Sequence, residues 1–299
     1  MNIVRIYELF PAETDCLAHL EAVRWHGTPI CPYCRATSST PLPKESRHHC
    51  NACKTTFSVT VRTIFHRTHL PLQKWFLAIS IILNAKKGLS SLQLSRDLQV
   101  NKNTAWRMGM QVRKAMGECE QRELLTGVVE VDETYIGGKP RKGNSGSSEQ
   151  DGGNKSTRGR GTKKTPVVGL IERGGKVRTK VVKKGDLTAK KLSDLVRQHV
   201  DIAASTLLTD EYAGYAGIKK FMEHHTVNHS ICYVGEDGTH TNSIESFWAI
   251  VKRAIVGQYH HVTVRYLPRY LVEISYRLNH RETANLFSLT IQRAIGVAS

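Results

Sequence analysis

The chain has 299 residues, 40% of them apolar, which is enough for about two domains that each bury a core. No stretch approaches the roughly 18 consecutive apolar residues of a membrane-spanning helix, and the N-terminus lacks a secretion-signal pattern. We therefore expect a cytoplasmic protein with no membrane partner. Its 43 Lys and Arg against 26 Asp and Glu give a net charge of +17, which indicates a polyanionic partner, nucleic acid first and anionic membrane second.

Residues 1–66 are expected to form a helix, ending near Trp25, and a small domain held together by zinc. Two C-x-x-C pairs with 15 residues between them supply four soft ligands: Cys31, Cys34, Cys50 and Cys53. Zn²⁺ prefers such ligands in a tetrahedron, and the spacing is typical of a zinc ribbon. Four thiolates leave no open position for water, so the single ion is structural. Two disulfides are the alternative, which a reducing cytosol disfavours.

Residues 67–122 are expected to be helical and to bind DNA. Helices are predicted at 72–83, 91–97 and 102–118, with a turn at 99–101. This pattern favours a helix-turn-helix, in which the polar start of the second helix enters the major groove. The side chains that would contact DNA there are Lys102, Thr104 and Arg107. An ordinary pair of helices is the alternative.

From residue 123 onward short β-rich runs replace the helical pattern, and we place a third domain at 123–299. A helix is predicted at 188–200, and the segment from Val262 to the end is expected to be mostly helical. Residues 137–165 are rich in Gly, Ser and Lys and predict a flexible basic insertion. The predicted strands are 128–131, 166–172, 176–182 and 205–209, with a short one near 225–231. The fold class is therefore α+β, with several domains.

Three acidic residues far apart in the sequence are suited to one two-metal site. Asp132 and Asp210 each end an apolar, strand-like run, and Glu245 lies on an amphipathic helix. Carboxylates are the ligands that Mg²⁺ and Mn²⁺ prefer, and two such ions support phosphodiester chemistry. Lys252 follows Glu245 by seven residues, so it shares the same helix face about 10 Å away. A lone Asp at a strand end is more often a turn residue, so the prediction depends on all three occurring together.

Together these pieces resemble the bacterial insertion-sequence transposases that join an N-terminal zinc ribbon to an RNase H-like catalytic core with a DDE triad. Besides the cysteine pairs, the matching motifs are Val131-Asp-Glu-Thr-Tyr-Ile-Gly-Gly-Lys139, Thr209-Asp-Glu-Tyr-Ala-Gly-Tyr215 and His240-Thr-Asn-x-x-Glu-x-Phe-Trp-x-x-x-Lys-Arg253. The resemblance implies a mixed sheet flanked by helices. It also implies movement of double-stranded DNA between terminal inverted repeats and a target, by an oligomer acting on paired ends.

The same resemblance implies roles for individual residues. Asp132, Asp210 and Glu245 would hold two Mg²⁺ or Mn²⁺ ions, and Lys252 would contact DNA near them. Members of this group often carry asparagine at the third triad position, and Asn242 lies one helical turn before Glu245. We favour Glu245 because its spacing to Lys252 fits the wider DDE pattern, and we keep Asn242 as a second ligand or an orienting residue.

Residues beside the triad are also candidates. His240, which precedes the triad helix, and Arg253 at its end are further expected DNA contacts. The acidic neighbours of the two aspartates are expected to be solvated or to support the ligands: Glu130, Glu133 and Glu211.

Three functions are compatible with these motifs. The leading one is a transposase that hydrolyses a phosphodiester and joins the freed 3′ hydroxyl to target DNA. The second is a nuclease or resolvase of the same fold, which cleaves and never joins. The third is a zinc-ribbon regulator that binds DNA with an inactive C-terminal domain. The intact acidic set favours an enzyme.

Overall fold

The computed structural model describes residues 1–117, 123–137, 164–227 and 240–296. The chain forms two compact units, Met1–Glu120 with His280–Ser299, and Gln121–Asn279. The predicted insertion at 137–165 falls almost entirely outside the described residues. Among the described helices, none combines the length and apolarity that crossing a bilayer requires.

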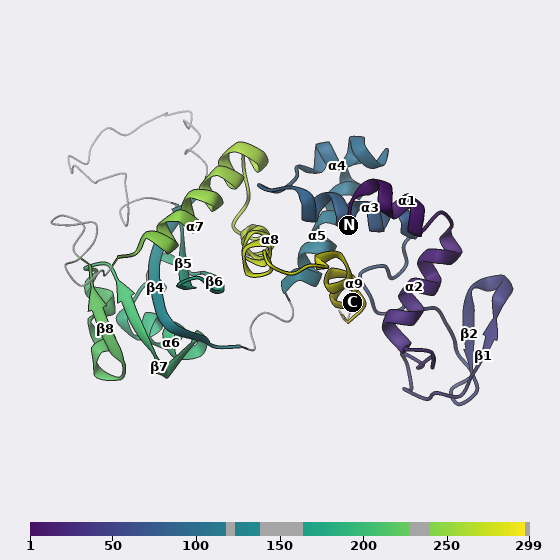
Figure 1. Ribbon diagram of the computed structural model, residues 1–299, viewed down its shortest axis with the longest axis horizontal. Coiled ribbons are helices and arrows are strands. Elements are labelled where there is room, and N and C mark those ends of the chain that lie inside the picture. Colours follow the sequence, from purple (N-terminus) through teal and green to yellow (C-terminus); the bar gives the residue numbers. More distant parts are fainter. Residues whose placement is uncertain (118–122, 138–163, 228–239, 297–299) are drawn as a thin grey trace, which may run out of the picture. The chain divides into compact units, whose positions relative to one another are not determined.

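The first unit is mainly helical (Figure 1). The helix predicted to reach Trp25 is in fact two helices, because Pro11 lies between them and cannot donate a backbone hydrogen bond. The helices of this unit are α1 (Ile3–Leu9), α2 (Glu13–Trp25), α3 (Leu72–Asn84), α4 (Ser91–Leu98), α5 (Lys102–Gly117) and α9 (Leu286–Gly296). A small antiparallel sheet of short strands accompanies them, β1 (Ser39–Leu42), β2 (Arg47–Cys50) and β3 (Thr56–Phe57).

Helix α9 completes the core of this first unit, although it is the last helix of the chain. Phe287 packs edge to face on Phe76, with ring centroids 5.8 Å apart. The Arg293 guanidinium donates to the Met116 carbonyl at 3.1 Å, and the Ile64 amide donates to the Ala294 carbonyl at 3.1 Å. The expected domain 123–299 therefore differs from the structure at its end, since the apolar face of α9 is buried among α2, α3 and α5.

The second unit is built on a mixed sheet, which in the described residues has the order β6-β5-β4-β7-β8. Strand β5 pairs antiparallel with β4 and β6, whereas β7 pairs parallel with β4 and β8. This is the RNase H-like arrangement expected from the sequence. The strands are β4 (Leu125–Ile136), β5 (Thr165–Glu172), β6 (Val177–Val181), β7 (Val200–Thr209) and β8 (Glu223–Thr226).

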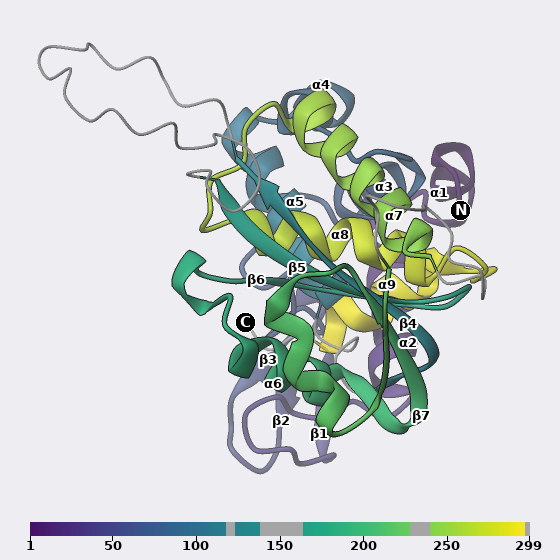
Figure 2. The ribbon, with the colours of Figure 1, turned by 90° about the vertical axis from the view of Figure 1, so that its left-hand side faces the viewer.

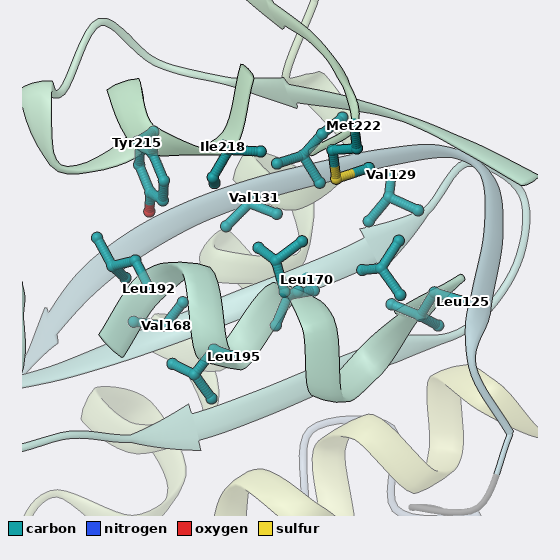
Figure 3. Close-up of a cluster of buried hydrophobic side chains, with 13 residues drawn as sticks. Leu125, Val129, Val131, Val168, Leu170, Leu192, Leu195, Tyr215, Ile218 and Met222 are labelled. Carbon is teal, nitrogen blue, oxygen red and sulfur yellow. The ribbon is translucent and has the colours of Figure 1, made fainter. Parts of the chain in front are cut away.

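Helices cover both faces of this sheet (Figure 2). On one face lie α6 (Ala189–His199), which Thr188 caps, and the 3₁₀ helix η4 (Ala213–Lys220). They bury an apolar cluster against β4 and β5, shown in Figure 3, in which Val131, Leu170 and Tyr215 are almost completely buried. On the other face lies α7 (Asn242–Arg253), which continues into a π-helical turn (Ala254–Tyr259). Helix α8 (Leu267–Asn279) packs beside β6.

Candidate functional site

The four predicted zinc ligands converge in the first unit. The sulfurs of Cys31 and Cys53 are 3.8 Å apart, those of Cys34 and Cys50 are 3.5 Å apart, and all four lie within 4.8 Å of one another. Four sulfurs bonded at the usual Zn–S length of about 2.3 Å stand about 3.8 Å apart in a tetrahedron. Hydrogen bonds from Thr55 lower the pKa of the Cys53 thiol to about 6, whereas at Cys34 a backbone hydrogen bond with Ala36 is outweighed by the neighbouring cysteines, which raise the pKa to about 12. The cluster therefore fits Zn²⁺ in both geometry and ligand type.

The parallel pairing of β4 with β7 brings Asp132 and Asp210 together, although 78 positions separate them in sequence. Val131 lies opposite Thr209, Asp132 is the next residue on β4, and Asp210 directly follows the end of β7. One ligand oxygen from each of Asp132, Glu133 and Asp210 lies within 4.8 Å of the others. The two aspartates that the sequence singles out are thus neighbours, as a shared metal site requires.

Electrostatics make this carboxylate group receptive to cations. Burial raises the pKa of Asp132 to about 7, and the charges of Glu133, Asp210 and Glu245 add to the rise. An oxygen-lined pocket with several negative charges is the environment in which a hard divalent ion replaces protons. Backbone amides hold the ligands in place, since the Glu133 amide donates to Asp132 at 2.7 Å and the Tyr212 amide donates to Asp210 at 3.1 Å.

Glu133 is a member of the carboxylate group that sequence reasoning assigned to a solvated or supporting role. Its Oε2 accepts a hydrogen bond of 2.9 Å from the hydroxyl of Tyr215, which is fully buried. Burial, followed by the charge of Glu133, raises the pKa of this hydroxyl, so Tyr215 remains a donor. The two motifs around Asp132 and Asp210 are therefore joined through their flanking residues. Tyr215 ends the second of these motifs, which is the one signal in the sequence for this contact.

Helix α7 brings Glu245 near the two aspartates. Glu245 lies in the first turn of α7 and is exposed, and its charge reaches Asp132, but it lies outside the group of three closely spaced carboxylates. Asn242 is the first residue of α7 and is also exposed. Lys252 and Arg253 occupy the last turn with exposed side chains. The structure therefore places the predicted third ligand beside the site, while its role as a ligand stays a prediction.

Close packing fixes where α7 crosses the sheet. Gly169 on β5 lies opposite Asp132 on β4, and α7 passes directly over it. A methyl group at Gly169 would lie 2.5 Å from Trp248 and 2.9 Å from Ile244, which is closer than atoms can approach. Glycine at this position thus allows α7 to lie near enough to the sheet for Glu245 to approach the aspartates.

Glu130 was expected to be solvated or supporting, and its completely buried carboxylate excludes the first of these two roles. It accepts hydrogen bonds from Arg173 at 2.8 Å, from Ser243 at 3.0 Å and from the Ile244 amide at 3.0 Å. His240, an expected DNA contact, has its Nδ1 3.5 Å from the same carboxylate and is half-buried. The start of α7 is therefore tied to β4 by a polar network that the sequence did not reveal.

The predicted helix-turn-helix has the expected local geometry. Ser90 caps α4 by accepting from the Gln93 amide at 3.2 Å. Gln99 ends α4 in the left-handed conformation, with φ of 50°, which turns the chain toward α5. Lys102 and Arg107 are exposed near the start of α5, and Thr104 is half-buried. Their contact with DNA stays a prediction.

Comparison with known proteins gives two family matches. The model of the ISXO2-like transposase domain matches residues 124–279, and that of a transposase zinc-ribbon domain matches residues 11–56. A curated relative, named as an uncharacterized protein in transposable element ISH50 of Halobacterium salinarum, is 29% identical over 256 residues. The aligned region covers 82% of this chain and 83% of that relative.

Solved structures are similar only at a remote level. The Mos1 strand transfer complex is 14% identical with a TM-score of 0.25, and the alignment covers 69% of this chain and 75% of that chain. The mariner Mos1 paired end complex with Mg is 10% identical with a TM-score of 0.29, and the alignment covers 99% and 96% of the two chains. Superpositions this loose support no conclusion.

The family assignment therefore depends on the sequence matches. The first of them begins at the start of β4 and ends with α8, so it spans the whole second unit. Because this match takes in more than half of the residues, the chain belongs to the family of ISXO2-like transposase domains and is a DNA transposase.

Proposed function

We propose that this transposase cuts and joins DNA by a two-metal-ion reaction, with Asp132, Asp210 and Glu245 as the ligands of two Mg²⁺ or Mn²⁺ ions. A single observation carries the proposal: the parallel pairing of β4 with β7 places the oxygens of two aspartates within 4.8 Å. Hard divalent ions are the common occupants of such oxygen sites.

The chain's residues would divide the work by position. Asp132 lies beside Asp210, which follows the end of β7, and it is influenced by the charge of Glu245 on α7, so it would help to hold both ions. Glu245 would close the second ion site from α7, with Asn242 orienting it or adding a neutral oxygen. When bound, the ions would activate the attacking water or 3′ hydroxyl and stabilise the leaving oxygen.

The basic surface residues would hold the DNA. Lys252 and Arg253 lie on the helix that carries Glu245, and they would contact a phosphate of the strand being cut. In the first unit, Lys102, Thr104 and Arg107 would contact the terminal inverted repeat from α5. One structural Zn²⁺ would hold the ribbon, and the active species would be an oligomer on two paired ends.

A strand-transfer experiment tests this proposal. Labelled duplexes carrying the inverted repeats that flank the gene would be incubated with purified protein, a plasmid target and Mg²⁺ or Mn²⁺. We expect joined products that require a divalent ion. Nicked donor DNA without joining would indicate a nuclease, and salt-sensitive binding without cleavage would indicate a DNA-binding regulator.

Two variants identify the third ligand. Glu245→Gln removes the charge and keeps the shape, and Asn242→Ala removes the amide oxygen. If Glu245 is the ligand, Glu245→Gln abolishes joining and raises the metal concentration needed for cleavage, whereas Asn242→Ala retains most activity. The reverse ranking would assign the third position to Asn242.

A further inference from the structure

The polar network at the start of α7 has a geometry that bears on the reaction. Glu130 lies two residues before Asp132 on β4, so strand alternation points both side chains to the sheet face that α7 covers. The two carboxylates nevertheless differ in their surroundings. Asp132 is half-buried among other acids, whereas Glu130 is fully buried among donors.

Both oxygens of Glu130 already accept hydrogen bonds. Oε1 accepts from Arg173 Nε at 2.8 Å and from Ser243 Oγ at 3.0 Å, and Oε2 accepts from the Ile244 amide at 3.0 Å. Arg173 is fixed in turn, because its Nη2 donates to the His240 carbonyl at 2.7 Å and its backbone amide to the Val128 carbonyl at 2.9 Å. The donors around Glu130 therefore satisfy both of its oxygens without a metal ion.

This carboxylate accepts from an amide in the first turn of α7 that the Thr241 side chain does not cap. Thr241 precedes the first helical residue and makes no capping hydrogen bond with its side chain. The amides of a first helical turn need acceptors, and a negative charge there is favourable. Glu130 on β4 supplies both an acceptor and a negative charge, because its carboxylate accepts from the Ile244 amide. The N-terminus of α7 is therefore tied to β4 through the Ile244 amide, in addition to the Asn242 amide, which donates to His240 Nδ1 at 3.3 Å.

The residue after Ile244 is Glu245. On a helix, neighbouring residues rotate and translate together, so an anchor at Ile244 fixes the Cα of Glu245. The same strand carries Asp132, so one rigid element sets the positions of both groups. We propose that Glu130 is a positioning residue of the transposase, which sets the distance of Glu245 from Asp132. This inference rests on the proposed role of Glu245 as a metal ligand.

The test compares Glu130→Gln with Glu273→Gln. Glu273 on α8 is a second fully buried carboxylate of the same unit. It accepts hydrogen bonds from Tyr259 and from Arg277. It is therefore a matched control for the loss of a buried charge. Each variant would be checked for folding by thermal melting, and its affinity for Mn²⁺ would be measured by titration calorimetry. Cleavage would be measured over a series of Mn²⁺ and DNA concentrations.

We expect Glu130→Gln to weaken Mn²⁺ binding and to lower the maximal cleavage rate, each by about 10–100-fold, the usual effect of removing a group that orients a metal ligand. The KM for DNA should stay unchanged. Glu273→Gln should lower the melting temperature without changing Mn²⁺ affinity. Wild-type Mn²⁺ affinity in Glu130→Gln, or equal losses in the two variants, would overturn the proposal.

A double variant separates positioning from a general structural effect. If Glu130 acts through Glu245, then Glu130→Gln combined with Glu245→Gln should bind Mn²⁺ as Glu245→Gln alone does. Additive losses would show that Glu130 acts independently of Glu245 and would overturn this inference, while the two-metal proposal would stand. If Glu245→Gln alone leaves both Mn²⁺ affinity and cleavage unchanged, Glu245 is not a ligand and this inference fails, whereas a two-metal reaction would then need Asn242 as its third ligand.

Discussion

The two candidate metal sites are built in opposite ways. The cysteine cluster takes its four ligands from two tight turns within residues 31–53, next to a sheet whose strands are two to four residues long. The carboxylate group includes Asp132 and Asp210, which are 78 positions apart in the sequence and meet at a sheet with its own apolar core. In the ribbon a bound ion would replace a core that the segment is too short to build, whereas in the second unit the core exists and would hold the proposed ligands.

Removing zinc is the largest perturbation that this contrast predicts. Cys34→Ser, or chelation, should unfold the ribbon, because a structural zinc site contributes about 10–16 kcal/mol to folding. Hydrogen exchange should show lost protection in β1–β3 and retained protection in β4 and β7. End binding should weaken as well. A variant with full zinc content and normal end binding would contradict the ribbon assignment.

Asp210→Asn should produce the largest effect on chemistry. It replaces a charged ligand by a neutral one, so cleavage should fall by at least about 10³-fold, equivalent to about 4 kcal/mol of transition-state stabilisation. End binding, measured by fluorescence anisotropy, should stay nearly unchanged. Asp201→Asn, near the opposite end of β7, is the matched control and should cleave normally. Equal loss of binding and cleavage would make Asp210 a structural residue.

A pH series should reveal the charge in the carboxylate group. The pKa of Asp132 is about 7 in the folded protein, against an ordinary value of 3.8, so the folded state keeps this proton to higher pH than the unfolded chain. Its contribution to stability is therefore full below about pH 4 and is lost as the pH rises through about 7. Without metal, the free energy of unfolding should fall by about 3 kcal/mol relative to Asp132→Asn over this range.

Divalent metal provides the control for the pH series. Millimolar Mg²⁺ should restore the stability lost at pH 8 in the wild type, because an ion bound only by the folded state stabilises it. The same addition should leave Asp132→Asn almost unchanged. A parallel pH dependence in the two proteins would show that Asp132 does not titrate in this range.

Gly169→Ala is the smallest change, and it tests the packing that brings α7 to the sheet. The added methyl group overlaps Trp248 and Ile244, so we expect a destabilisation of about 1–3 kcal/mol, measured by urea unfolding, and reduced cleavage as α7 moves outward. Gly217→Ala, where the nearest atom is 3.7 Å away, should be tolerated. Equal effects of the two substitutions would mean that the position of α7 has no bearing on the site.

The contrast between the sites also explains what the sequence could predict. The zinc ligands follow from spacing alone, because both pairs lie in local turns. The neighbouring positions of Asp132 and Asp210 were predicted because each ends an apolar run, and the structure brings them together. The contact of Glu130 with the start of α7 could not be predicted, because a strand pattern does not show which helix will pack above it. The position of His240 beside Glu130 could not be predicted for the same reason.

Arg173 and α9 also make contacts with distant segments that the sequence pattern could not predict. Arg173 lies in the turn between β5 and β6, and its guanidinium reaches Glu130 on β4 and the His240 carbonyl ahead of α7. The C-terminal segment was correctly predicted to be helical. Periodicity gives the apolar face of α9 and not the core that receives it, which proved to be that of the first unit.

The return of α9 to the first unit has a consequence for biosynthesis. The second unit is one continuous segment, Gln121–Asn279. The two segments of the first unit precede and follow it in the sequence. On the ribosome the second unit emerges complete before α9 does, whereas the helices of the first unit must wait for α9 to complete their core. The part of the protein translated first therefore reaches its final packing last.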